Sequence, residues 1–221
     1  MNTKQPQRGV EKRSENTHLR RQKMIRDACE LIAELGPIQF TLSSLAAKSE
    51  VTLPTINNQL GKKADVFQVI VDCMIQKTQS TLFDFDLSSP LLALEQLTES
   101  LISLYRGDEA LYKAAFFIGE TEDLFEHEIP DVLYEKSINT AIGIVKSARE
   151  NGELLGNIDQ TLLAHMLFEN QRFVRRDWMR GYISLEVYKH KLLSAAYVTL
   201  AADASKEMHT ILLNKIDELA L

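Results

Sequence analysis

Four small polar side chains lie close together in the stretch Thr41–Lys63, namely Thr52, Thr55, Asn57 and Asn58. Hydroxyl and amide groups both donate and accept hydrogen bonds, so they can pair with base edges and phosphates without a large apolar surface. An asparagine amide can also make a two-point contact with adenine. The types and spacing of these residues therefore indicate a surface that contacts nucleic acid.

The same stretch has the pattern of two short helices joined by a tight turn. Leu42, Leu45 and Ala46 share one helical face because they are spaced at i, i+3 and i+4. Ile56 lies in the middle of the second helix and can close over Ala46, whose small side chain lets two helices cross at a steep angle. We therefore expect a helix-turn-helix in which residues 52–60 form the recognition helix.

Residues beside the two helices complete the expected surface. Thr41 is a good N-cap for the first helix, and the amides at that helix start can take a DNA phosphate. Lys63 opens the helix that follows, where a phosphate could meet an ammonium group and helix amides together. The residues expected to contact DNA are Arg20, Thr41, Ser43, Thr52, Pro54, Thr55, Asn57, Asn58 and Lys63.

The charge of the chain changes sign at Lys63. The 221 residues carry a net charge of −6, which by itself argues against a nucleic-acid partner. Residues 1–63, however, contain 11 Lys and Arg against 6 Asp and Glu, whereas residues 64–221 contain 14 against 25. A small basic module on an acidic body is typical of a DNA-binding head joined to a body that binds something else.

The N-terminal segment leads into this module. Residues 1–16 are polar and lack periodicity, so we expect a disordered basic arm. Its Lys and Arg side chains either reach along a DNA groove or have no structural role. A helix is expected from residue 18 to residue 35, ended by Gly36 in a left-handed conformation and by Pro37, with Phe40 as an apolar plug before the next helix.

Together these features resemble the DNA-binding head of the tetracycline-repressor-like (TetR/AcrR) family over residues 17–75. The resemblance implies three helices leading into a long fourth helix, an all-α body and a homodimer. The usual role in the family is a repressor that a small ligand releases from DNA. The residues that carry the resemblance are Gly36, Phe40, Thr41, Leu45, Ala46, Val51, Thr52, Thr55, Ile56, Leu60, Lys63, Val66 and Phe67.

The chain departs from the family pattern in the turn and in the recognition helix. Glu50 stands where the family usually has Gly, and a Glu in a left-handed conformation costs about 1 kcal/mol. Asn57 replaces the usual aromatic residue, and Leu60 replaces the usual Phe. Pro54 is uncommon at this place, although a first helical turn tolerates Pro. The fold is compatible with all of these changes.

Beyond the helix-turn-helix domain, residues 17–63, we expect a helical ligand-binding and dimerisation body over residues 64–221. The whole chain is thus expected to be all-α, with a three-helix head and a helical-bundle body. Apolar periodicity predicts the body helices at residues 64–83, 91–105, 109–118, 130–150, 159–180, 185–204 and 205–219.

The two long helices at residues 159–180 and 185–204 have more apolar surface than one buried stripe needs. We expect them to pair with their copies in a two-fold, four-helix interface, as the family resemblance also implies. A dimer places two recognition helices about 34–36 Å apart, so its DNA target should be palindromic. The residues expected at the interface are Leu163, Leu167, Val174, Trp178, Leu192, Ala196 and Leu200.

Aromatic residues of the body indicate a candidate ligand cavity. Because the body is acidic and has Tyr and His near its centre, a small apolar or cationic molecule is the expected effector. For each residue the alternative is plain core packing, and a histidine on an apolar helix also fits a hydrogen-bonded core residue. The candidates are Phe83, Phe85, Tyr112, Phe116, Phe117, Tyr134, His165 and Phe168.

Other classes of protein find little support. No run approaches the roughly 20 apolar residues of a membrane span, and the N-terminus lacks the apolar core of a secretory signal.

Cys29 and Cys73 fall on apolar helical positions and are expected to be small hydrophobic residues in a reducing cytoplasm, with a disulfide or redox switch as the alternative. The chain has no Gly-rich phosphate loop, metal-ligand motif or nucleophile turn. We expect no enzyme, cofactor or metal.

Two alternatives to a ligand-controlled repressor stay open. In the first, the departures in the head abolish specific DNA reading, and the body acts by binding a protein partner. In the second, the protein binds DNA but no ligand, and its abundance or a partner controls it.

Overall fold

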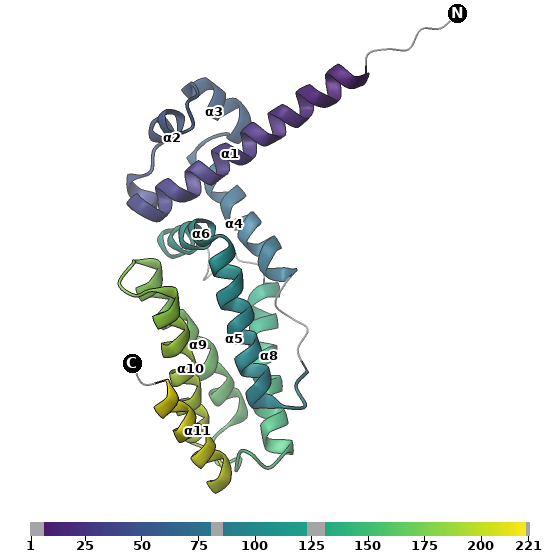
Figure 1. Cartoon of the computed structure of the whole chain (residues 1–221), viewed down its shortest axis with the longest axis vertical. Helices are drawn as coiled ribbons and strands as arrows, with labels where there is room; N and C mark the ends of the chain where they lie inside the picture. Colours follow the sequence, from purple (N-terminus) through teal and green to yellow (C-terminus); the bar gives the residue numbers. More distant parts are fainter. Residues whose placement is uncertain (1–6, 81–85, 123–130, 220–221) are drawn as a thin grey trace, which may run out of the picture. The chain divides into compact units, whose positions relative to one another are not determined.

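The computed structural model describes residues 7–80, 86–122 and 131–219, with the backbone alone for residues 7–14 and 131–134. Over these ranges the chain forms ten α-helices (Figure 1). Their one extended pairing is an isolated bridge between Leu154 and Ala204. The expected all-α fold is confirmed. No helix in the described part of the chain is both long and apolar enough to cross a membrane.

The chain divides into two compact units. The first unit comprises Met1–Ile75 and Glu109–Phe125, and the second comprises Gln76–Asp108 and Glu126–Leu221. Helix α6 therefore belongs with the N-terminal helices, although the chain passes through α5 of the second unit before reaching it.

The first unit contains α1 (Gln7–Gln39), α2 (Leu42–Lys48), α3 (Leu53–Leu60), most of α4 (Lys63–Gln79) and α6 (Glu109–Thr121). Helix α1 packs along α6 and also contacts α2 and α3. Gly36 interrupts the helical path of α1 with a φ of 78°, directly before Pro37. The predicted left-handed end of the first helix is therefore confirmed.

The first helix begins earlier than expected. Residues 7–16, predicted to lie in a disordered arm, form the first turns of α1, whereas residues 1–6 lie outside the described residues. These turns present no apolar stripe, so periodicity could not reveal them. Their Gln, Glu, Lys and Arg residues are good helix formers, which favours a helix even where the sequence has no apolar period.

The helix-turn-helix packs around a small apolar core. Phe40, Leu45 and Ile56 are completely buried. The ring of Phe40 lies 5.8 Å from that of Phe67 on α4, so the predicted role of Phe40 as an apolar plug is confirmed. Cys29 is buried in the same unit and Cys73 is half-buried, each as a thiol.

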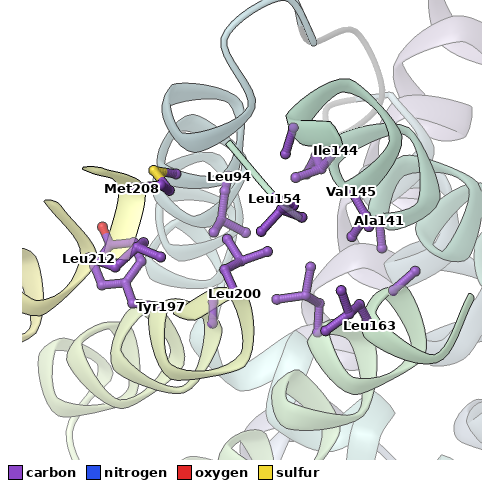
Figure 2. Close-up of a cluster of buried hydrophobic side chains, with 14 of the residues drawn as sticks. Leu94, Ala141, Ile144, Val145, Leu154, Leu163, Tyr197, Leu200, Met208 and Leu212 are labelled. Carbon is purple, nitrogen blue, oxygen red and sulfur yellow. The ribbon is translucent and has the colours of Figure 1, made fainter. Parts of the chain in front are cut away.

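The second unit is a bundle of α5 (Pro90–Gly107), α8 (Asp131–Glu150), α9 (Gln160–Met179), α10 (Leu185–Ala201) and α11 (Lys206–Glu218). Successive helices from α8 to α11 pack against one another, and α5 packs on α8 and α10. Leu94, Ile144, Leu163 and Leu200 project into the shared core, and Leu212 joins it from α11 (Figure 2).

Side-chain caps set several helix starts in this bundle. Asp159, Ser184 and Ser205 each accept a hydrogen bond from the backbone amide three residues later, at the starts of α9, α10 and α11. These caps satisfy amides that have no partner inside the helix. The predicted starts of the three helices are within one residue of those observed.

The loop before α9 is held to the end of α10 by Asp203. The buried Asp203 carboxylate accepts hydrogen bonds from the backbone amides of Gly156 at 3.0 Å, Asn157 at 2.8 Å and Ile158 at 3.2 Å. Helix α10 stops at Ala201 instead of the predicted residue 204. The turn that follows places the carboxylate against this loop.

Candidate functional site

Helices α2 and α3 form the helix-turn-helix expected from the sequence. Helix α2 spans Leu42–Lys48 and α3 spans Leu53–Leu60, with Thr52 as the N-cap of α3. Leu45 and Ala46 of α2 are buried, as are Ile56 and Leu60 of α3. The apolar sides of both helices thus face the core of the unit, which leaves their polar sides outward.

Both helices begin with a threonine cap. The Thr41 hydroxyl oxygen accepts a hydrogen bond from the Ser44 amide at 3.0 Å, and the Thr41 amide donates to the Ser44 hydroxyl at 3.2 Å, which completes a capping box. The Thr52 hydroxyl lies 2.9 Å from the Thr55 hydroxyl and also caps α3. These bonds fix the orientation of α3 at its start.

The outward side of α3 is uncharged and mostly polar. Thr52, Pro54, Asn57 and Asn58 are exposed, whereas Thr55 is half-buried. The two amides have free access to a partner on the surface. Neutral amides on an exposed helix can read base edges by hydrogen bonding, which suits major-groove contact.

The turn between the helices contains a strained residue. Glu50 has a φ of 57°, in the left-handed region that disfavours side chains with a Cβ. Glu50 is also the one acidic residue between Thr41 and Lys63 in the sequence. The left-handed turn suspected from the family pattern is therefore present, with Glu in place of the usual Gly.

Two polar contacts hold the pair of short helices on α1. The Ser49 hydroxyl donates to the buried Asp27 carboxylate at 2.6 Å, and the Lys23 ammonium donates to the same oxygen at 2.9 Å. At the other end, the Arg21 guanidinium donates to the Gln59 carbonyl at 3.3 Å. The Ser49 and Arg21 bonds tie the turn and the end of α3 to α1, whereas the Lys23 bond orients Asp27 from within α1.

The basic residues around the motif differ in how far they are already engaged. Arg20 is exposed. The Lys63 ammonium lies 5.4 Å from the ring centroid of Phe67 and 6.0 Å from that of Phe40, within range of cation–π attraction. Lys48 pairs with Glu30 at 2.8 Å, and that hydrogen bond raises the pKa of Lys48.

The start of α4 is already occupied by its own carboxylate. The Lys62 amide donates to Asp65 at 2.7 Å. A Cβ on Gly61, where φ is 87°, would lie 2.4 Å from the same Asp65 oxygen. A phosphate at the amides of this helix start would therefore have to displace Asp65, whereas the exposed Thr41 and Ser43 lie at the start of α2.

The second unit contains a partly open cavity of about 90 Å³ between α5, α8, α9 and α10. Most of its wall is aliphatic, and its polar groups are hydroxyls and one amide. The lining residues are Leu94, Leu97, Thr98, Leu101, Ser137, Thr140, Ala141, Ile144, Leu167, Phe168, Gln171, Leu192 and Ala196.

Of the residues predicted to line a ligand cavity, Phe168 does so. Tyr112, Phe116 and Phe117 lie on α6 in the first unit, where the rings of Tyr112 and Phe116 are 6.2 Å apart. His165 is half-buried on α9 and does not line the cavity.

The structure does not test the other aromatic candidates. Phe83 and Phe85 lie outside the described residues, and the side chain of Tyr134 does as well.

The residues predicted for a dimer interface are all covered within the second unit. Leu163, Leu167, Val174, Trp178, Leu192, Ala196 and Leu200 are each at most 9% exposed. Other apolar side chains of α9 and α10 are exposed instead, namely Leu162, Met166, Phe173 and Val198. Both helices therefore have an inner and an outer apolar side, and the prediction named the inner one.

Three aromatic residues pack together beyond the cavity. The rings of Tyr105 and Trp178 stack at 5.0 Å, and Tyr188 lies 6.1 Å from Tyr105. Burial raises the pKa of both tyrosines. The Gln171 side chain, which lines the cavity, is one of the polar groups near Tyr105 that partly offset the effect of burial on its pKa. The cavity wall and the aromatic cluster thus share one amide group.

The polar cavity residues Thr98, Ser137, Thr140 and Gln171 were not predicted from the sequence. Hydroxyl and amide residues occur on the sides of many helices, so their presence on α5, α8 and α9 carries no distinct signal. Only the packing of the helices shows that they meet at one cavity.

Comparison with known proteins agrees with this architecture. No family model matches the chain. The chain is 24% identical over 200 residues to the HTH-type transcriptional repressor BepR of Brucella suis biovar 1 (strain 1330), covering 84% of this chain and 93% of that protein.

Solved structures of similar architecture cover nearly the whole chain. A gamma-butyrolactone receptor (ArpA-like protein) aligns with a TM-score of 0.65 at 18% identity, covering 92% of this chain and 98% of that one. The TetR-family protein CprB from S. coelicolor A3(2) aligns at 0.62 and 18% identity, with 91% and 97% covered.

SmeT, the repressor of the Stenotrophomonas maltophilia multidrug efflux pump SmeDEF, aligns with a TM-score of 0.56 at 19% identity, covering 85% of this chain and 92% of that one. Similarity at this level establishes the fold. The helix-turn-helix, the helical bundle behind it and these alignments lead to one conclusion: the chain has the all-α fold of the TetR-family regulators.

Proposed function

We propose that the protein is a transcriptional repressor that binds DNA as a homodimer and is released by a small molecule. The observation that carries this proposal is the outward side of α3, where Thr52, Pro54, Asn57 and Asn58 are exposed on a helix that the Thr52 cap and a buried core hold in place. A rigid helix with exposed amides next to a basic α1 is suited to a major groove.

The names of similar proteins support this role. BepR and SmeT are named as repressors, and SmeT has also been solved in complex with triclosan. The gamma-butyrolactone receptor is named for a small molecule. Repression needs only an operator and a bound dimer, because a protein that occupies the operator competes sterically with polymerase.

Dimerisation is supported by large apolar side chains that are exposed on the outer side of α9 and α10. We call this surface the exposed apolar stripe. Leu162, Met166 and Phe173 are spaced at i, i+4 and i+11 and so share one side of α9, and Val198 is exposed on α10. Phe173 is 77% exposed. Large apolar side chains that line up on one surface indicate a protein interface. In the proposed dimer this stripe packs against the same stripe of the second subunit, and a two-fold axis relates the two subunits.

Control by a ligand is supported by the cavity in the second unit. Occupancy of the cavity would favour one arrangement of the bundle, and a changed spacing of the two recognition helices would lower operator affinity. Linkage requires the operator to weaken ligand binding by the same factor.

The proposal is tested by selecting fragments of the source genome with the purified full-length protein at two salt concentrations. We expect a palindrome with half-sites about one helical turn apart, because the two recognition helices enter successive major grooves. Recovery of fragments that share no motif, with binding that falls steeply as the salt concentration rises, would mean that the protein contacts only the DNA backbone. That result would reject a sequence-specific repressor and favour a body that acts through a protein partner.

A further inference from the structure

The cavity of the second unit is lined almost entirely by uncharged groups. Among the residues that the structure describes, none that lines it is Asp, Glu, Lys, Arg or His. A cationic or anionic molecule would lose its hydration there without gaining an opposite charge, which is strongly unfavourable. The acidic character of the whole body, which led us to expect an apolar or cationic effector, therefore does not extend to the cavity wall.

The two threonines of the wall can accept hydrogen bonds but have already used their protons. The Thr98 hydroxyl donates to the Leu94 carbonyl at 2.9 Å, and the Thr140 hydroxyl donates to the Lys136 carbonyl at 2.8 Å. A threonine hydroxyl has one proton and two lone pairs. What each threonine can offer to a bound molecule is therefore an acceptor oxygen.

The other polar groups of the wall are the Gln171 amide and the Ser137 hydroxyl. Each of them can both donate and accept a hydrogen bond, so neither restricts the chemistry of the bound molecule. Thr98 on α5 and Thr140 on α8 are therefore the wall groups that discriminate between ligands. Their acceptor oxygens favour a ligand that brings a proton to donate.

The volume limits the size of the guest. The cavity measures about 90 Å³, less than the roughly 150 Å³ of an engineered apolar cavity that binds benzene. A molecule of one ring or a short chain can enter with small movements of the half-buried Phe168 beside it. A compound of several fused rings would require the helices to separate.

We propose that the cavity binds a small, uncharged, mainly apolar molecule that carries one hydrogen-bond donor, a phenol or an alcohol, and that Thr98 and Thr140 accept from this donor. The inference rests on the proposed function in treating the cavity as the effector site. It adds the chemical class of the effector and the residues that select it.

The test measures calorimetric binding of four matched one-ring probes to the full-length protein without DNA: phenol, anisole, benzoate and benzylammonium. Phenol should bind saturably, and anisole should bind about fivefold more weakly because its ether oxygen has no proton to donate. The two ions should show no binding at concentrations that saturate with phenol.

Variants identify the acceptors. Thr98→Val and Thr140→Val keep the side-chain shape, and each should lower phenol affinity severalfold while leaving anisole affinity unchanged. Thr210→Val is the matched control, because the Thr210 hydroxyl also donates to a carbonyl of its own helix, that of Lys206 at 3.1 Å, but lies outside the cavity. This variant should bind phenol like the natural sequence.

The proposal is overturned if anisole or either ion binds with the same affinity as phenol, or if none of the four probes binds. It is also overturned if neither Thr98→Val nor Thr140→Val lowers the affinity for phenol. The proposed repressor role fails by a different route, when genomic selection recovers no shared motif. Because the probe measurements contain no DNA, the two failures are distinguishable.

Discussion

At the scale of single residues, Glu50 is the clearest conflict between the sequence and its backbone. Its φ of 57° lies in the left-handed region, which costs a residue with a Cβ about 1–2 kcal/mol. Glycine adopts the same conformation without this cost, although it loses more chain entropy on folding. The turn of the helix-turn-helix is therefore less stable than it could be.

We predict that Glu50→Gly raises the free energy of unfolding by about 0.5–1 kcal/mol, because relief of backbone strain exceeds the added entropy cost. The measurement is urea denaturation of the full-length protein followed by circular dichroism. Glu50→Ala is the control, since it removes the carboxylate but keeps the Cβ. Equal stabilisation by Ala and Gly would mean that charge, and not backbone conformation, limits the turn.

The sequence predicted individual residues well where local chemistry decides their role. Thr41 and Thr52 are caps because their hydroxyls accept from amides three residues later, and Gly36 ends the regular part of α1 at a φ of 78°. Lys63 was expected to meet phosphate only. Its position over two aromatic rings depends on how α4 packs, which no local pattern records.

At the scale of elements, the buried Asp203 is the main polar tie between the end of α10 and the loop before α9. Three backbone amides donate to its carboxylate. Helix periodicity predicted α10 to run past this residue. A carboxylate that binds a loop distant in sequence gives no periodic signal, so the early end of the helix could not be predicted.

Asp203→Asn should lower the free energy of unfolding by about 1–3 kcal/mol, since an NH₂ group would replace an acceptor oxygen of the buried carboxylate that faces partly buried backbone amides. Chemical denaturation provides the measurement. The control is Asp177→Asn, where an exposed carboxylate lies 3.8 Å from Lys191 and the change should stay within about 0.5 kcal/mol. Similar effects of both variants would contradict the anchoring role of Asp203.

Three buried tyrosines make the bundle of the second unit sensitive to alkali. Burial raises the pKa of Tyr105, Tyr188 and Tyr197, and Tyr197 also donates to Glu95 at 2.8 Å. An unfolded tyrosine releases its proton near pH 10, whereas these stay protonated in the folded state. The stability they contribute is therefore complete below pH 10 and is lost as pH rises above it.

We predict that the free energy of unfolding falls above pH 10 by up to about 1.4 kcal/mol per pH unit for each of the three tyrosines. Denaturation curves at pH 9, 10 and 11 measure this slope. Tyr197→Phe removes one of the three groups and should make the fall shallower. An identical slope in this variant would show that Tyr197 ionises equally in both states.

At the scale of the whole molecule, α9 and α10 show what a sequence pattern can and cannot separate. Both helices are apolar on two sides, which the sequence indicated correctly. The seven residues chosen for an interface belong to the inner side, packed in the bundle. Leucine on an inner side and leucine on an outer side look the same in sequence, so only the packed structure assigns them.

The outer stripe leads to a prediction about assembly. Phe173→Glu should shift the protein from dimer to monomer in sedimentation at micromolar concentration, because it places a charge at the proposed two-fold interface. Ile38→Glu is the control, since Ile38 is 81% exposed but lies in the first unit. A natural protein that sediments as a monomer, or a dimer unaffected by Phe173→Glu, would contradict the proposed interface.

The account depends most directly on whether α3 reads bases. The measurement is the ratio of affinities for the selected operator and for a shuffled sequence, compared between the natural protein and Asn57→Ala or Asn58→Ala. We predict that at least one variant loses about 5- to 150-fold in operator affinity, because a bidentate base contact is worth about 1–3 kcal/mol. Its affinity for shuffled DNA should stay the same, since phosphate contacts are kept. Equal losses on both DNAs, or no loss in either variant, would contradict base reading by this helix.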